Sequence, residues 1–151
     1  MDERDLLACI EAVAHGFEIV QSIFPGWRFQ AADTVAAFGL HGALLLGPPE
    51  AITATNADHW HERLAGFEIT LMRDGVDADH GHASNVLGGG PLAALRHLVE
   101  VLAGDRDSPP LTPREVVATG TLTRALPIKA GERWSTRLHG LPLAGLSVTF
   151  A

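Results

Sequence analysis

Glu18 is the residue of this sequence that most directly suggests chemistry, because it lies between apolar neighbours. It belongs to the stretch His-Gly-Phe-Glu-Ile-Val, residues 15–20, whose apolar alternation predicts a strand that ends before Pro25-Gly26. A carboxylate in an apolar strand is costly to bury unless it is paired or binds a cation. Two interpretations stay open: Glu18 binds a metal ion in a pocket, or it lies on a solvated strand face and pairs with Arg28.

Two residues downstream of Glu18 could exchange protons with a ligand. Asp33 lies in the first turn of a short helix predicted over residues 32–38, and His41 precedes a buried strand predicted over residues 43–46. An imidazole titrates near neutral pH and can act as an acid or a base. The structural alternatives are helix capping by Asp33 and a turn histidine that bonds the backbone at position 41.

The other histidines form two His-x-His pairs, His59 with His61 and His80 with His82. On a strand, both imidazoles of a pair would share one face and could chelate zinc. The sequence identifies no third ligand, and the alternative is that both pairs lie on the surface. Gly88-Gly89-Gly90 lacks the lysine, hydroxyl and acidic partners of nucleotide-binding loops, so we set nucleotide binding aside.

The apolar periodicity around these residues predicts an α+β domain with two main helices. Helices are expected over residues 2–14 and 91–103, the second begun by Pro91. Residues 66–73 and 76–83 are expected to form a β-hairpin around Asp74-Gly75. The remaining strands of a mixed sheet are predicted over residues 115–122, 133–138 and 144–150.

Composition limits the function classes. With 151 residues, 46% of them hydrophobic, the chain is long enough for one domain with its own core, residues 1–151. Eleven basic and 18 acidic residues give a net charge of −7, which argues against nucleic acid or anionic membrane as a partner. The single cysteine, Cys9, excludes an internal disulfide. The acidic start and the lack of a long apolar run lead us to expect a cytoplasmic protein.

Four blocks of the sequence resemble one family in the same order. Residues 15–27 resemble its Glu-Ile-Val-Asp-Ser-Arg segment, and residues 32–49 resemble its Ala-Asp and Ala-Asp-Asn block. Residues 86–103 resemble its Leu-Gly and Pro helix, and residues 116–132 resemble its Thr-Gly-x-Leu-Thr strand and turn. The chain is therefore similar to the 2-keto-4-pentenoate hydratase and 4-oxalocrotonate decarboxylase family, of the fumarylacetoacetate hydrolase superfamily.

This resemblance implies the mixed β-roll of the fumarylacetoacetate hydrolase C-terminal type, without the family's N-terminal segment. It also implies lyase chemistry on a 2-oxo or 2-hydroxydienoic acid at a Mg²⁺ or Mn²⁺ ion with three carboxylate ligands. Only one of these ligands, Glu18, is present here, and the family's Asp-Asn pair is replaced by Ala37-Phe38. We expect no metal in the isolated chain, and Glu18 as a ligand only if a partner supplies the others.

Two functions stay open. The first is a truncated or repurposed hydratase-like enzyme that acts on a small enolisable 2-oxo molecule by acid–base chemistry. The second is a non-catalytic or split-enzyme subunit that binds a ligand or a complementary hydratase-like chain. A homo-oligomer is expected in either case, because the missing segment would expose apolar surface.

The resemblance also suggests which side chains form the site. Glu18, Asp33 and His41 are expected to converge as catalytic groups on one cavity. The substrate-binding residues expected around them are Arg28, Phe38, Leu40 and Thr121, with Phe38 and Leu40 as an apolar lining.

Overall fold

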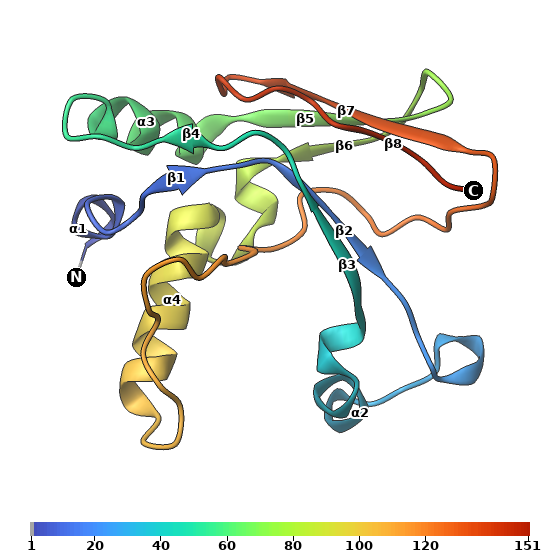
Figure 1. The fold of residues 1–151 in the computed structure, drawn as a ribbon, viewed down its shortest axis with the longest axis horizontal. Coiled ribbons are helices and arrows are strands. Elements are labelled where there is room, and N and C mark those ends of the chain that lie inside the picture. The colour runs from blue at the N-terminus through green and yellow to red at the C-terminus, as the bar shows by residue number, and fades with distance from the viewer. Residues whose placement is uncertain (1) are drawn as a thin grey trace.

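The computed structural model describes residues 2–151, and its largest sheet is antiparallel with the strand order β6-β5-β7-β8. This sheet lies across the top of Figure 1. The hairpin between β5 and β6 turns at Asp74-Gly75, where φ is 52° and 81°, as a type I′ turn requires. The predicted hairpin is therefore confirmed. The strands are β5 (Glu68–Arg73), β6 (Val76–His82), β7 (Arg133–His139) and β8 (Ser147–Thr149).

A two-stranded ribbon extends from this sheet and carries the candidate residues. It consists of β2 (Gly16–Val20) and β3 (His41–Leu46), paired antiparallel, and it leads to the short helix α2 (Ala31–Ala36) at its far end (Figure 1). Next to it, β1 (Ala12–Val13) pairs with β4 (Glu50–Ala51). Both ribbon strands were predicted, but β3 is not a buried strand, since Leu46 is 51% exposed.

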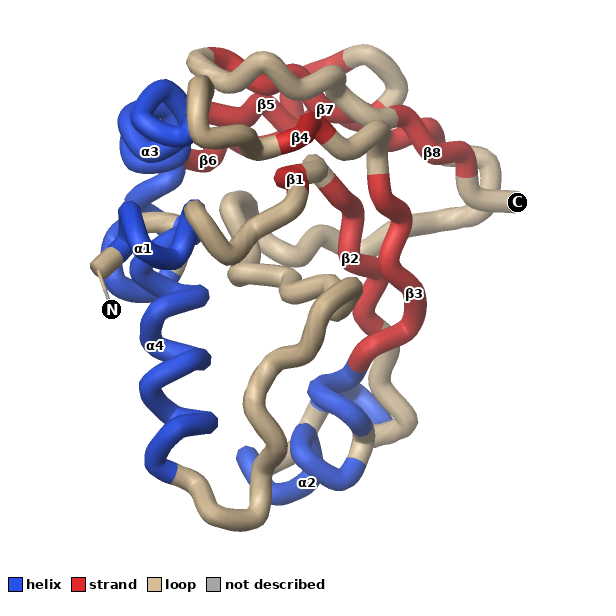
Figure 2. The backbone as a smooth tube through the Cα atoms, turned by 60° about the vertical axis from the view of Figure 1, so that its left-hand side comes forward, coloured by secondary structure: helices blue, strands red, loops and turns tan. Residues whose placement is uncertain are grey.

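Three further helices pack together beside the sheet. They are α1 (Glu3–Leu7), α3 (Ala57–Gly66) and α4 (Pro91–Gly104), and Figure 2 shows α4 descending opposite the ribbon. The predicted helix over residues 91–103 is confirmed. The helix predicted over residues 2–14 is wrong beyond Leu7, because Ala12-Val13 bonds β4 instead of continuing the helix.

Helix α3 is an element that the sequence reasoning did not predict. Trp60 and Leu64, four residues apart on one face, are 3% and 5% exposed and anchor it in the core. Helix α3 also carries His59 and His61, so the strand geometry on which the zinc interpretation rested is wrong for this pair.

The core lies where these helices meet the sheet. Leu7 is 1% exposed and clusters with buried side chains of α3 and α4 and with Ala83, which follows β6. Half-buried side chains such as Ile10 and Leu138 pack around this cluster. The buried members are Leu7, Trp60, Leu64, Phe67, Ala83, Leu92 and Leu143.

The α+β class is confirmed, with two corrections to its details. Every strand pairing among residues 2–151 is antiparallel, so the sheet is not mixed as predicted. Residues 115–122 form no strand, and Gly120 has a φ of 131° that would interrupt a ladder there. Within the described residues, no helix has the length and hydropathy that crossing a membrane requires.

Candidate functional site

Glu18 and His41 meet on one face of the β2–β3 ribbon. A bulge between Ile19 and Val20 places His41 opposite Val20, which shares a strand face with Glu18. Oε1 of Glu18 consequently lies 3.4 Å from Nδ1 of His41, and the two side chains are 40% and 47% exposed. A carboxylate in contact with an imidazole can pass protons to and from a bound molecule, and such contacts are often long before a ligand binds.

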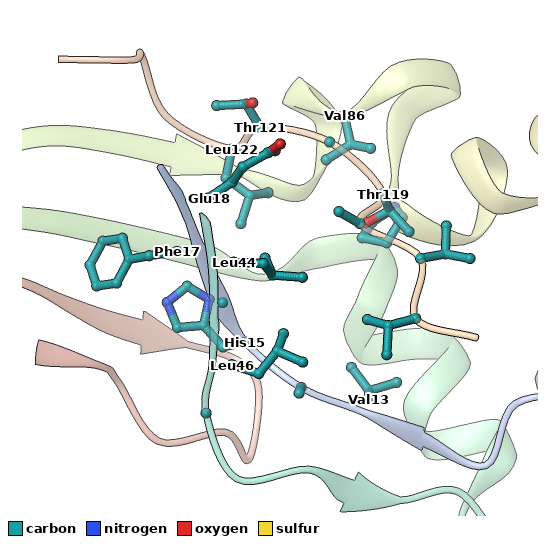
Figure 3. Close-up of a pocket in the computed structure, with 18 of the residues that line it drawn as sticks. Val13, His15, Phe17, Glu18, Leu44, Leu46, Val86, Thr119, Thr121 and Leu122 are labelled. Atoms are coloured by element: carbon teal, nitrogen blue, oxygen red, sulfur yellow. The ribbon is translucent and has the colours of Figure 1, made fainter. Parts of the chain in front are cut away.

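A cavity of about 1660 Å³ lies beside this pair. Its walls come from the ribbon, from α4, from the inner face of the four-stranded sheet and from residues 110–128. In Figure 3, Glu18 points toward Thr121 and Leu122, while Leu44 and Leu46 lie on the ribbon side. Most of the lining is apolar, with Leu92, Leu95, Val99 and Leu102 coming from α4. The Glu18 carboxylate therefore faces a mostly apolar space.

The structure brings only part of the predicted site to this cavity. Glu18 and Thr121 line it, whereas His41 is not among the lining residues and contacts Glu18. The carboxylate of Asp33 instead accepts the backbone N–H of Gln30 at 2.8 Å and caps α2. Helix capping was the structural alternative for Asp33. The helix that it caps, α2, lies at the far end of the ribbon (Figure 1).

The other three predicted binding residues are not among those that line the cavity. Phe38 is 89% exposed, whereas Leu40 is 9% exposed and packed inside. Arg28 is exposed, and Glu18 pairs with His41 rather than with this arginine. The turn around Gly39 separates these residues from the cavity, because positive φ at Phe38, Gly39 and Leu40 reverses the chain just before His41.

His15 is a residue of this region that the sequence reasoning did not select. It is 8% exposed and lines the same cavity, and its Nε2 lies 2.9 Å from the hydroxyl of Thr136 on β7. Burial lowers the pKa of the His15 imidazole below its ordinary value of 6.5. Its alternation with Phe17 and Ile19 is the sequence signal that could have placed it on their strand face, opposite the face of Glu18.

The wall that carries Thr121 is held against β6 by close backbone contact. A side chain at Gly81 would overlap the carbonyl oxygen of Leu122, and this oxygen accepts Nδ2 of Asn85 at 2.8 Å. Nearby, the backbone N–H of Arg124 donates to Asp79 at 2.8 Å and holds the pKa of that carboxyl below its usual range, with help from the guanidinium. This wall is therefore fixed in place although it is not a strand.

The residues present do not fit a three-carboxylate metal site. Among residues 2–151, no group of three His, Cys, Asp or Glu side chains is placed to hold one ion. His80 and His82 instead pair with Asp77 and Glu68 on the exposed face of the hairpin. Mg²⁺ requires several oxygen ligands in near-octahedral order, which Glu18 cannot provide by itself.

Comparison with known proteins identifies what this chain is similar to, although no protein-family model matches it. A 2-hydroxyhexa-2,4-dienoate hydratase from Comamonas testosteroni is 29% identical over 146 residues, which are 97% of this chain and 52% of the hydratase. The TodF product hydratase from Pseudomonas putida is 30% identical over 137 residues, 91% of this chain and 48% of that protein. The chain thus spans about half the length of the curated relatives that it matches.

The fold has a counterpart among solved structures. A 4-oxalocrotonate decarboxylase from Pseudomonas putida G7, complexed with magnesium and adipate, superimposes with a TM-score of 0.81 at 22% identity. The match covers 99% of this chain and 52% of the decarboxylase. These comparisons confirm the resemblance to the 2-keto-4-pentenoate hydratase and 4-oxalocrotonate decarboxylase family, and the part matched is the C-terminal half.

Proposed function

We propose that this chain is a hydratase-like lyase that acts by acid–base chemistry on a small, enolisable 2-oxo molecule. The single observation that carries the proposal is the contact between Glu18 and His41 at the edge of a mostly apolar cavity. The likeness to hydratases supports the reaction class. We assign proton transfer to Glu18 and His41, and contact with the substrate oxygen to the hydroxyl of Thr121.

The chemistry needs a base and an acid near one carbon chain. From a 2-oxo-4-enoate, the Glu18 carboxylate takes a proton from C3, and the electron pair of that C–H bond forms a C2=C3 bond as the carbonyl pair moves onto the oxygen. The proton is returned to C5 with relay by the imidazole of His41, and the electron pair moves back from the oxygen to give a C3=C4 bond conjugated to the carbonyl group. Water then adds its hydroxyl to C4, the C3=C4 electron pair takes up a proton at C3, and the proton that the water gives up passes to the Glu18–His41 pair, which restores the one delivered to C3.

The lining of the cavity defines the substrate class. Apolar side chains from the ribbon and α4 offer few partners for a second carboxylate at the far end of a substrate. A buried charge without a partner is costly, so a dicarboxylic dienoate would fit poorly. We therefore assign a 2-oxo monocarboxylate with an alkyl or alkenyl chain.

One observation favours a second candidate function, that of a subunit which binds a complementary hydratase-like chain. The cavity of about 1660 Å³ is larger than pockets for small ligands, which are roughly 300–1,000 Å³. A polypeptide segment that filled part of it would leave space for a small substrate. Such a chain could also bring the carboxylates that Glu18 lacks, and Mg²⁺ or Mn²⁺ would then fit.

The proposal also covers the fold, the location and the oligomeric state of the chain. We infer a single domain with the β-roll of the fumarylacetoacetate hydrolase C-terminal type, supported by the TM-score of 0.81. We also infer a cytoplasmic protein that forms a homo-oligomer. The homo-oligomer is supported by exposed apolar side chains, which usually find partners. The most exposed of these are Phe38 (89%), Val35 (80%) and Ile23 (76%). Light scattering at high micromolar concentration tests this, and a monodisperse monomer would contradict it.

The function is tested by spectrophotometry with a 2-hydroxy-2,4-dienoic acid, whose conjugated absorbance disappears on hydration. Glu18→Gln should reduce the rate at least 100-fold, because general acid–base catalysis contributes about 10²–10⁴-fold. The matched control is Glu68→Gln, since Glu68 also pairs with a histidine, at 3.6 Å from His82, but does not line the cavity. Equal rates in the two variants would end the assignment of Glu18.

A further inference from the structure

The β2–β3 ribbon is attached to the four-stranded sheet by very few polar contacts. The two sheets share no strand pairing. Among residues 2–151, the contact between Nε2 of His15 and Oγ1 of Thr136, at 2.9 Å, is the one hydrogen bond that joins residues 12–51 to the strands β5–β8. Both residues are buried, at 8% and 8% exposure. Apolar contacts are not directional, so this bond is the directional contact between ribbon and sheet.

The hydroxyl of Thr136 also bonds the opposite side. The backbone N–H of Leu146 donates to Oγ1 of Thr136 at 2.9 Å. A threonine hydroxyl has one hydrogen to donate, and with a neutral imidazole it can donate that hydrogen to Nε2 of His15. The N–H of Leu146 then donates to the hydroxyl of Thr136, and this hydroxyl donates to Nε2 of His15.

Protonation of His15 would break this arrangement. Nε2 of an imidazolium is a donor, so Thr136 would have to accept two hydrogen bonds and its own hydrogen would lose its partner. The cation would also be buried in a mostly apolar wall, which is costly. We propose that His15 and Thr136 form a proton-sensitive latch, in which the neutral imidazole holds the β2–β3 ribbon to the sheet and positions Glu18 over the cavity.

The pKa of His15 gives the direction of the effect. Burial alone lowers it from 6.5. The charged side chains that line the same cavity are Glu11, Glu18, Arg114, Glu115 and Arg124. A base with a lowered pKa binds fewer protons when the ribbon is docked than when it is open. The latch is therefore complete above about pH 6.5 and is lost as the pH falls through the lowered pKa of His15.

Amide hydrogen exchange tests the latch without any need for turnover. Protection factors of β2 (Gly16–Val20) are measured by NMR at pH 7.5 and pH 5.0, with β5 as the internal reference. The expected result for the natural protein is a loss of protection in β2 of at least tenfold at pH 5.0, and little change in β5. This outcome does not depend on the proposed function, on which the inference rests only in assigning Glu18 a role.

Two pairs of variants separate a hydrogen-bonded latch from simple packing. His15→Gln keeps a group that bonds Thr136 but does not titrate, so β2 should stay protected at both pH values. His15→Leu keeps bulk without the bond and should be unprotected at both, with the ring resonances of His41 shifted at pH 7.5. Thr136→Ser and Thr136→Val should repeat this contrast if a His15 variant does not fold. Equal protection in the Gln and Leu variants, or pH-independent protection in the natural protein, would overturn the proposal.

Discussion

Replacing Gly81 by alanine should loosen the wall of the cavity that carries Thr121. The new methyl group would overlap the carbonyl oxygen of Leu122 and lie 3.0 Å from Cγ2 of Ile69, so the wall must move away from β6. Overpacking costs about 1–3 kcal/mol and loss of the Asn85 hydrogen bond about 1 kcal/mol, so we expect roughly 2–4 kcal/mol in the free energy of unfolding.

Thermal unfolding followed by circular dichroism measures this effect. For a chain of about 150 residues, 1 kcal/mol shifts Tm by about 2–4 °C, so Tm should fall by roughly 4–16 °C. The control is Gly66→Ala in α3, because a methyl group there would meet nothing within 4 Å. That variant should unfold at or slightly above the natural Tm, since alanine favours a helix. An unchanged Tm for Gly81→Ala would show that residues 119–124 do not lie against β6.

Three further predictions concern stability and metal binding. Asp79→Asn should destabilise the protein more at pH 7 than at pH 2. A carboxyl with a lowered pKa contributes its full stabilisation above its ordinary value of 3.8 and loses it as the pH falls through the lowered pKa. Equal losses of stability at both pH values, measured by chemical denaturation, would contradict this. Leu7→Ala should cost about 2–5 kcal/mol, since Leu7 is 1% exposed, whereas Leu87→Ala at 63% exposure should cost less than about 0.5 kcal/mol. Isothermal titration of the chain with Mg²⁺ should show no saturable binding in the micromolar range, and a one-to-one isotherm there would refute the judgement that Glu18 lacks co-ligands.

Local signals account for the parts of the fold that the sequence predicted well. Pro91 at a helix start and Asp74-Gly75 in a hairpin act through their own φ angles, so no distant contact is needed to recognise them. The helix predicted beyond Leu7 failed because Ala12-Val13 pairs with residues almost forty positions away. Helix α3 was missed because only Trp60 and Leu64 of its ten residues are buried, which leaves a weak apolar period.

The candidate site, like the fold, was predicted from the sequence only in part. Glu18 stood out as a charge in an apolar strand, and the family resemblance suggested that His41 lies near it. Asp33 was assigned by its place in the resemblance, but its carboxylate caps α2. The contact between His15 and Thr136 spans 121 positions and depends on how the ribbon docks on the sheet. No local pattern contains that information, although the strand alternation could have placed His15 on the same face as Phe17 and Ile19.

The most direct test of the account is proton exchange at the carbon next to the carbonyl of a 2-oxo acid. Purified protein is mixed with 2-oxopentanoate in D₂O, and the loss of the C3–H signal is followed by ¹H NMR, with the uncatalysed rate subtracted. We predict exchange catalysed by the natural protein and by Glu68→Gln, and none above background with Glu18→Gln. Exchange that persists in Glu18→Gln would contradict the claim that the carboxylate paired with His41 is the reacting group.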